Sequence, residues 1–280
     1  MRISFSIRVL LAIVLMCAMG LAVGVIPRIK RQRIIAKLEH EPLVSNILGL
    51  GIASEPSAFD TILGCEGPVE YLGFEGRTDE NDVLTAEVFV NAYALSPLIE
   101  LTVDNVSVKP CTVYPFAEKL VIRSIRGEEI NNWLRGLLTA QTCLKEIEVE
   151  WTTGFSDEHL EILCGIKGLE RISLLGTSAT GVGLRRDRNC DHAIELDIVD
   201  CPITDDGLRV IAECDKLESV FLDFPSRVHI PDLRILFTAS RSLDLTIRLG
   251  RRSSTTELMR MQQEMDDYFG HRTLYFETSK

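Results

Sequence analysis

One pattern of apolar residues returns about every 24 positions through the middle of this chain. Its four clearest copies begin at Leu144, Leu169, Ala193 and Leu217, which are 25, 24 and 24 residues apart. Each copy opens with the alternating apolar spacing of a short strand and goes on toward the spacing of an amphipathic helix. Neither element can bury its apolar face alone, so units of this length must stack into one shared core.

Weaker copies of the strand pattern extend the repeat in both directions. They are Val69-x-x-Leu72-x-Phe74, Leu98-x-x-Leu101-x-Val103, Ala117-x-x-Leu120-x-Ile122, Leu245-x-Ile247 and Leu274-x-Phe276. The sequence therefore predicts about nine strands, of which four carry a strong signal.

The strong copies resemble the cysteine-containing class of leucine-rich repeats. Cys201 stands where the strand gives way to a turn, Ile203-Thr204-Asp205 opens the following helix, and Cys190 and Cys214 each stand three residues before the next apolar start. The resemblance implies an α/β solenoid with a concave parallel sheet and convex helices. The whole chain is similar to bacterial membrane-anchored leucine-rich-repeat proteins.

The resemblance covers residues 69–249 and has departures. Ala117 and Ala193 replace the first leucine, Leu175 and Phe221 stand where polar residues are usual, and the first three copies lack the Thr-Asp helix opening. The flanks are expected to cap the core: residues 43–68 at the amino end, and residues 250–280 at the other end, where Ser254 to Glu257 has capping-box spacing.

Residues 9–26 form an apolar segment without a charge, after a short tail of residues 1–8 and before a basic segment of residues 27–42. A helix of eighteen residues reaches roughly 27 Å, close to the ~30 Å hydrocarbon core of a bilayer. We therefore expect a single transmembrane helix here. A cleaved signal peptide is the alternative, because Ala18-Met19-Gly20 and Ala22-Val23-Gly24 both have the small residues that signal peptidase accepts.

Basic residues flank this segment unequally. Five follow it within eleven positions and two precede it, so the positive-inside rule favours a cytoplasmic repeat domain on a cell-membrane anchor. The basic segment is expected either to lie on anionic headgroups or to act only as a charged stop to the spanning helix.

Charge excludes one class of partner. Of 30 basic and 41 acidic residues, seven basic and no acidic ones lie before Leu38, which leaves 23 against 41, or -18, in the remainder. A domain of this charge repels phosphate backbones and attracts basic partners, so no nucleic-acid binding is expected.

The sequence predicts no catalytic, cofactor or metal site. Cys190, His192, Cys201 and Cys214 are of the residue types that bind zinc, but they form no C-x-x-C pair. The three cysteines stand at repeat positions where a small buried residue is expected. The chain is therefore expected not to be an enzyme.

The predicted binding surface is formed by the variable positions between the apolar strand residues. One column across the sheet reads Gly73, Thr102, Val121, Glu148, Ser173, Asp197, Phe221 and Thr246, and the next reads Glu75, Asp104, Arg123, Glu150, Leu175, Val199, Asp223 and Arg248. Candidate partner-binding residues are Glu146, Glu148, Glu150, Trp151, Glu195, Asp197, Asp200, Phe221 and Phe224.

Carboxylates beside exposed aromatic residues suit a protein or peptide that is basic and partly apolar, because aromatic anchors supply binding energy and charges steer. The sequence thus predicts a membrane-tethered interaction module. Two alternatives stay open: the carboxylates are simply solvated while the aromatic rings pack against neighbours, or the chain is a structural envelope protein that self-associates.

Overall fold

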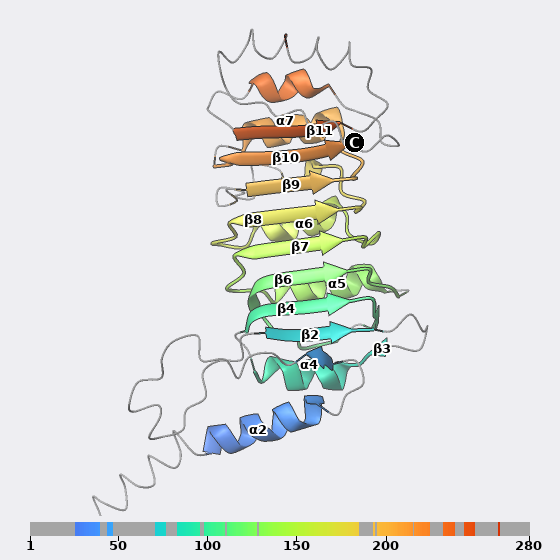
Figure 1. The fold of residues 1–280 in the computed structure, drawn as a ribbon, viewed down its shortest axis with the longest axis vertical. Coiled ribbons are helices and arrows are strands. Elements are labelled where there is room, and N and C mark those ends of the chain that lie inside the picture. The colour runs from blue at the N-terminus through green and yellow to red at the C-terminus, as the bar shows by residue number, and fades with distance from the viewer. Residues whose placement is uncertain are drawn as a thin grey trace, which may run out of the picture.

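The computed structural model describes residues 26–39, 44–46, 71–76, 83–95, 98–109, 111–127, 129–184, 193, 195–214, 216–224, 232–238, 244–249 and 263. Within them the chain forms a nine-stranded sheet of order β1-β2-β4-β6-β7-β8-β9-β10-β11 (Figure 1). β1 pairs antiparallel with β2, and the other eight strands are parallel. The fold is an α/β stack in which each unit follows its predecessor in chain order.

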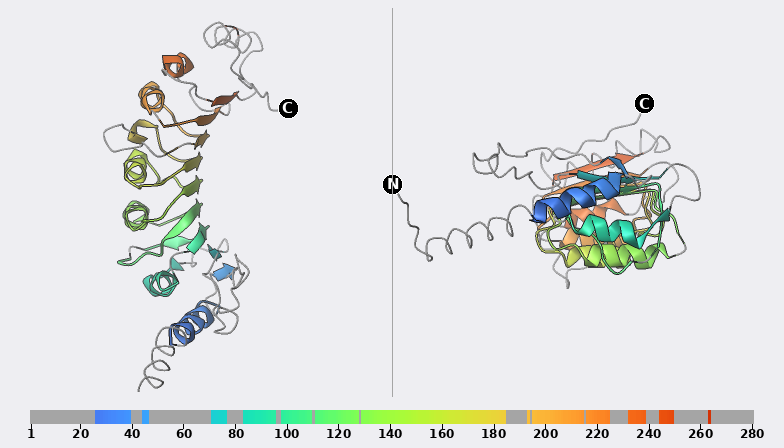
Figure 2. Two further views of the ribbon diagram at one scale, coloured as in Figure 1. Left: turned by 90° about the vertical axis from the view of Figure 1, so that its left-hand side faces the viewer. Right: turned by 90° about the horizontal axis from the view of Figure 1, so that it is seen from below.

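The strands of the main sheet are β1 (Val44–Asn46), β2 (Tyr71–Glu75), β4 (Leu98–Asp104), β6 (Ala117–Arg123), β7 (Glu146–Glu150), β8 (Arg171–Leu175), β9 (Glu195–Val199), β10 (Ser219–Phe224) and β11 (Asp244–Leu249). The helices are α2 (Ile26–Glu39), α4 (Ala86–Tyr93), α5 (Ile130–Thr139), α6 (Asp157–Cys164) and α7 (Asp205–Glu213), with 3₁₀ helices η2 (Val182–Leu184) and η4 (Leu233–Thr238). Two short strands, β3 (Val83–Leu84) and β5 (Ser107–Val108), form a second sheet. The helices that alternate with the strands lie on one side of the main sheet (Figure 2).

The strand register confirms the alignment of the repeats. Leu72, Leu101, Leu120, Ile147, Ile172, Leu196, Val220 and Leu245 form one row of paired residues, and Phe74, Val103, Ile122, Val149, Leu174, Ile198, Leu222 and Ile247 form the row two positions later. All sixteen residues are buried. Successive strand residues point to opposite faces, so both rows enter the core between the sheet and the helices. The expected strand at Leu274 to Phe276 lies outside the described residues.

Carboxylates at the helix openings connect neighbouring units. The carboxylate of Asp157, at the start of α6, accepts hydrogen bonds from the Thr180 hydroxyl at 2.7 Å, the Thr180 N–H at 3.2 Å and the Gly183 N–H at 3.0 Å. One unit later, Asp205 Oδ1 accepts from the Asp232 N–H at 2.8 Å. In α6 and α7, the aspartate after the helix N-cap therefore holds the turn of the following unit.

At the amino end, α2 packs against α4 with Ile35 and Leu38 buried. Lys30, Arg33 and Lys37 on the same helix are exposed. The basic segment is thus a helix docked on the stack.

The two expected caps lie largely outside the described part of the chain. Of residues 43–68 the structure describes only β1, and of residues 250–280 only one position. The predicted membrane helix also lies outside the described part, apart from its last residue; among the helices that the structure describes, none is long and apolar enough to cross a bilayer.

His159 gives the stack a pH-dependent element. Its Nδ1 accepts the Ser156 N–H at 3.1 Å, and its Nε2 lies 3.4 Å from the Asn131 carbonyl, so the neutral Nε2–H tautomer fits the site. The side chain is fully buried. Burial disfavours the imidazolium and lowers the pKa of His159 below its ordinary value of 6.5.

A folded-state pKa below the unfolded value means that stability is present above about pH 6.5 and is lost as the pH falls through the folded pKa. His159→Gln keeps an acceptor for the Ser156 N–H and does not titrate. We expect wild type to lose more stability than this variant between pH 7.5 and pH 5.5, measured by urea unfolding of the full chain in non-ionic detergent. Equal losses in both proteins would contradict the assignment.

Candidate partner-binding face

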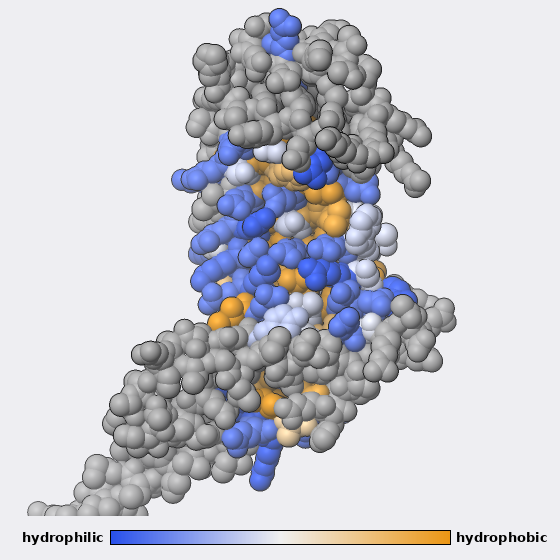
Figure 3. All heavy atoms as spheres, in the orientation of Figure 1, coloured by the Kyte–Doolittle hydropathy of each residue, from blue (hydrophilic) through white to orange (hydrophobic). Residues whose placement is uncertain are grey.

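The face of the main sheet that points away from the helices presents three side-chain positions from each parallel strand. Polar side chains cover much of it, and an apolar patch lies toward the ends of β8 and β9 (Figure 3). In the side view of Figure 2 the sheet bows slightly, with this face on the hollow side. We call it the free face.

The free face is acidic. Its carboxylates are Glu75, Glu100, Asp104, Glu146, Glu148, Glu150, Glu195, Asp197, Asp223 and Asp244, and its cations are Lys119, Arg123, Arg171 and Arg248. Ten negative and four positive charges leave -6 on the strands. Such a field attracts basic partners and is screened by salt.

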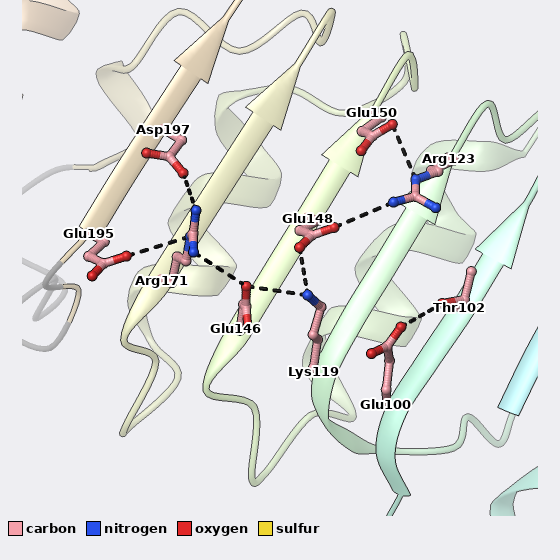
Figure 4. A network of polar contacts seen from close by, with 10 residues as sticks. All are labelled: Glu100, Thr102, Lys119, Arg123, Glu146, Glu148, Glu150, Arg171, Glu195 and Asp197. Atoms are coloured by element: carbon pink, nitrogen blue, oxygen red, sulfur yellow. Dashed lines mark hydrogen bonds and ion pairs between the residues drawn. The ribbon is translucent and has the colours of Figure 1, made fainter. Parts of the chain in front are cut away.

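Much of the charge at the centre is paired across strands (Figure 4). Lys119 Nζ lies 2.6 Å from Glu148 and 3.4 Å from Glu146. Arg123 lies 3.2 Å from Glu150 and 3.6 Å from Glu148. Hence the acidic residues of β7 are held by cations from β6.

On the other side of β7, Arg171 continues the network. It lies 2.7 Å from Asp197, 3.6 Å from Glu195 and 3.9 Å from Glu146. Five predicted partner-binding carboxylates, Glu146, Glu148, Glu150, Glu195 and Asp197, therefore already contact a cation. Cross-strand pairs of opposite charge stabilise a sheet modestly, by about 0.2 to 1 kcal/mol each.

Lys119 and Arg171 lie in a third outward column, two residues before the first predicted column. Glu146 and Glu195 of this column were predicted, but its two cations were not. Burial lowers the pKa of Lys119, but hydrogen bonding and attraction from Glu148 and Glu146 outweigh it, so the pKa is raised. The pKa of Arg171 is raised chiefly by its hydrogen bond to Asp197. Both side chains stay charged and offset part of the negative charge at the centre of the face.

Uncompensated negative charge lies toward the ends of the network. Burial raises the pKa of Asp104, and Glu75 and Glu150 raise it further against the opposing effect of Arg123. Burial likewise raises the pKa of Asp223, with Asp200 adding to the effect and Arg248 opposing it. Asp223 pairs with Arg248, whereas Asp104 forms no ion pair among the described residues, so the uncompensated charge of the two is that of Asp104.

The three predicted aromatic residues have different positions. Trp151 is 52% exposed, at the turn after β7. Phe221 is half-buried on the free face, with the Arg248 guanidinium 5.4 Å from its ring centroid. Phe224 is buried, so its predicted place on the binding surface is wrong: β10 continues through it, and alternation from Leu222 points its ring into the core.

The cysteines considered as zinc ligands that the structure describes, Cys201 and Cys214, are buried. Cys201 is buried, and burial raises the pKa of its thiol, which makes it a poor source of thiolate. Cys214 is buried at the end of α7. Among the described residues no group of three or more His, Cys, Asp or Glu side chains is placed to hold a metal ion. Cys190 and His192 lie outside these residues.

No family model, curated protein or solved structure matches the chain.

Proposed function

We propose that this chain is a leucine-rich-repeat protein of the cysteine-containing class, and that it acts as a membrane-tethered interaction module. The unit length near 24 residues, the parallel strand contributed by each unit and the helices on one side support the class. Its partner is a protein or peptide segment that is basic and partly apolar, and it binds on the free face.

The observation that carries this proposal is the distribution of charge on the free face. The ion-pair network orders the centre and neutralises part of its charge, with three cations against five carboxylates. Asp104 and Glu75 form no ion pair among the described residues and add to the net negative charge. Binding of a basic segment would cost little side-chain entropy at the ordered centre. The unpaired carboxylates at the ends would attract the segment electrostatically. Apolar side chains of the same segment would cover the patch at β8 and β9.

The tether in this proposal is the segment of residues 9–26, placed in the cell membrane with the repeats in the cytoplasm. The exposed Lys30, Arg33 and Lys37 of α2 follow it directly and suit the anionic headgroups of the inner leaflet. Because α2 is docked on α4, the amino end of the stack would then face the bilayer. Membrane-impermeant thiol labelling of Thr153→Cys in intact cells tests the side: labelling before permeabilisation would contradict the cytoplasmic placement.

The binding test removes negative charge without breaking the network. In Glu75→Gln/Asp104→Asn/Asp244→Asn, three carboxylates of the free face become neutral, and none of the three forms an ion pair among the described residues. The matched control, Glu87→Gln/Glu161→Gln/Glu213→Gln, makes the same charge change on the helix layer. The probe is a labelled peptide of alternating leucine and arginine, titrated into the full chain in detergent and followed by fluorescence anisotropy.

We expect the free-face variant to bind the probe about five- to tenfold more weakly, with a smaller dependence on salt, while the control binds like wild type. Equal binding by both variants would contradict a docking role for the free face.

A second candidate, a structural protein that self-associates, is favoured by Val90, Tyr93 and Ile99, large apolar residues that are 51%, 48% and 41% exposed near the amino end. Concentration-dependent oligomers that persist in the free-face variant and are lost in Val90→Ser/Tyr93→Ser would support it.

A further inference from the structure

The free face already contains one complete site for a guanidinium group. Arg248 lies over the Phe221 ring, 5.4 Å from the centroid, and its Nη1 is 3.6 Å from Asp223 Oδ2. An aromatic ring and a carboxylate from the neighbouring strand together hold a cation that the chain supplies itself. Arginine suits such a site because its planar group stacks on a ring while its N–H groups pair with a carboxylate.

Trp151 and Asp200 provide the same two groups, an aromatic ring and a carboxylate, at the carboxyl ends of the strands. Trp151, Gly176 and Asp200 occupy the same position in three successive units: their N–H groups donate to Leu175, Val199 and Asp223 carbonyls at 2.7, 2.9 and 3.1 Å. Neighbouring strands are about 4.8 Å apart, so Trp151 and Asp200 are separated by roughly 10 Å along this row.

Gly176 lets the indole occupy the space between them. A Cβ at this glycine would lie 2.3 Å from Cε3 and 2.6 Å from Cζ3 of Trp151, so the ring lies directly against the glycine. The ring therefore leans from its own unit toward the unit of Asp200. The half-buried side chains of Leu175 and Val199 lie at the paired ends of β8 and β9.

The backbone of Trp151 is unusual for a residue of its size. Its φ is 50°, and the same turn position in other units is filled by Asn105 at 50°, Ser124 at 50°, Gly176 at 62° and Asp200 at 52°. Small or polar residues tolerate this left-handed conformation, whereas a bulky aromatic residue is strained in it. Asparagine or glycine adopts this turn conformation more readily than tryptophan does. The conformation of the turn therefore does not explain why a half-exposed tryptophan stands here.

The cation that would complete this second site is missing from the described part of the chain. Among those residues no cationic group lies over the Trp151 ring, and Asp200 forms no ion pair. Burial is the main cause of the raised pKa of Asp223, and Asp200 is close enough to add to it.

We infer that Trp151, Gly176 and Asp200 form a niche for an arginine side chain of the partner, which stacks its guanidinium on the indole and pairs it with Asp200. The aliphatic stem of that arginine and the apolar residues beside it cover Leu175 and Val199. This inference rests on the proposed function and names the anchoring contact within it.

The test uses the full chain in detergent and two probes, the leucine–arginine peptide and a leucine–lysine peptide of the same length. Trp151→Asn removes the ring but suits the left-handed turn, and Asp200→Asn removes the charge. Tyr93→Asn is the matched control, because Tyr93 is a similarly exposed aromatic residue on α4. Acrylamide quenching adds a local readout, since Trp133, the second tryptophan, is fully buried and serves as the reference.

We expect Trp151→Asn and Asp200→Asn each to bind the arginine probe at least tenfold more weakly than wild type, and to bind the two probes with similar affinity. The control Tyr93→Asn should bind both probes like wild type. The arginine probe should shield Trp151 from acrylamide, and the urea midpoint of Trp151→Asn should be equal to or above that of wild type.

Three other results would overturn the niche, and they distinguish its failure from the failure of the proposed function. If Trp151→Asn binds normally while Glu75→Gln/Asp104→Asn/Asp244→Asn does not, the niche is wrong and docking on the free face stands. If wild type binds neither probe, both the niche and the proposed function fail. A clear loss of stability in Trp151→Asn would assign the ring a structural role and would overturn the niche.

Discussion

Replacing Asp157 with alanine is expected to lower the free energy of unfolding by about 3 kcal/mol, although the residue lies at the surface end of a helix. Its carboxylate accepts from the Thr180 hydroxyl and from the N–H groups of Thr180 and Gly183, which belong to the next unit. Hydrogen bonds to a charged acceptor contribute about 1.5 to 3 kcal/mol each, and the three act on one short turn, so their effects are not additive.

The loss should also change the form of the unfolding curve. A stacked fold is stabilised mainly by contacts between neighbouring units, so weakening one interface uncouples the parts on either side of it. We expect the single urea transition of the full chain, followed by circular dichroism, to broaden or split. Asp157→Asn, which keeps one acceptor oxygen, should lie between alanine and wild type.

Glu158→Ala is the matched control for this experiment. Glu158 is the next residue on the same helix turn, and its ion pair with Arg135 is exposed. Exposed pairs contribute about 0 to 1 kcal/mol, so the control should stay close to wild type. Equal effects at Asp157 and Glu158 would show that the carboxylate of Asp157 is not the link between units.

Gln141→Leu is expected to cost a similar amount, about 3 kcal/mol, although leucine is more apolar and of similar size. The side chain of Gln141 is buried, and its amide bridges two segments. Oε1 accepts from the Ala117 N–H at 3.1 Å, and Nε2 donates to the carbonyls of Pro115 at 3.0 Å and Leu137 at 2.9 Å. Leucine would remove the side-chain partner of one buried N–H and two buried carbonyls, and an unsatisfied group of this kind costs about 1 to 3 kcal/mol.

The matched control for Gln141 is Thr142→Ala, at the exposed neighbouring position. Urea unfolding in the same detergent should show a large loss for Gln141→Leu and a change within about 0.5 kcal/mol for Thr142→Ala. A stable Gln141→Leu protein would mean that water enters and satisfies the three backbone groups. In that case the amide would not be needed to join α5 to the start of β6.

The stacking of the units could be predicted well from the sequence. Alternating apolar residues and a period near 24 are local properties, and they placed Ile147, Ile172, Leu196 and Val220 in one row that the strand register confirms. Irregular units were harder to predict. In the described part of the unit after β8, the helical segment is the short η2, where the pattern suggested a longer helix. The α2 helix joins the amino end of the stack, although its sequence indicated only a basic segment.

The candidate site could be predicted less well. The predicted carboxylates do reach the free face, but their pairing with Lys119, Arg123 and Arg171 depends on residues 24 to 29 positions away in the chain. Phe224 was misplaced because the end of β10 could not be located from the sequence alone. The contact of Trp151 with Gly176 depends on a left-handed turn that no apolar pattern marks.

The sequence by itself determined the repeating unit, the row of residues that enters the core and the excess of negative charge, because each of these depends on residue type and spacing along one strand. Only the tertiary structure decided which charges on the free face are already paired and which aromatic residue remains exposed. The physical reason is that both depend on side chains of neighbouring units meeting across strands about 4.8 Å apart. Neighbours of that kind are set by register and turn conformation, which become defined when the units stack.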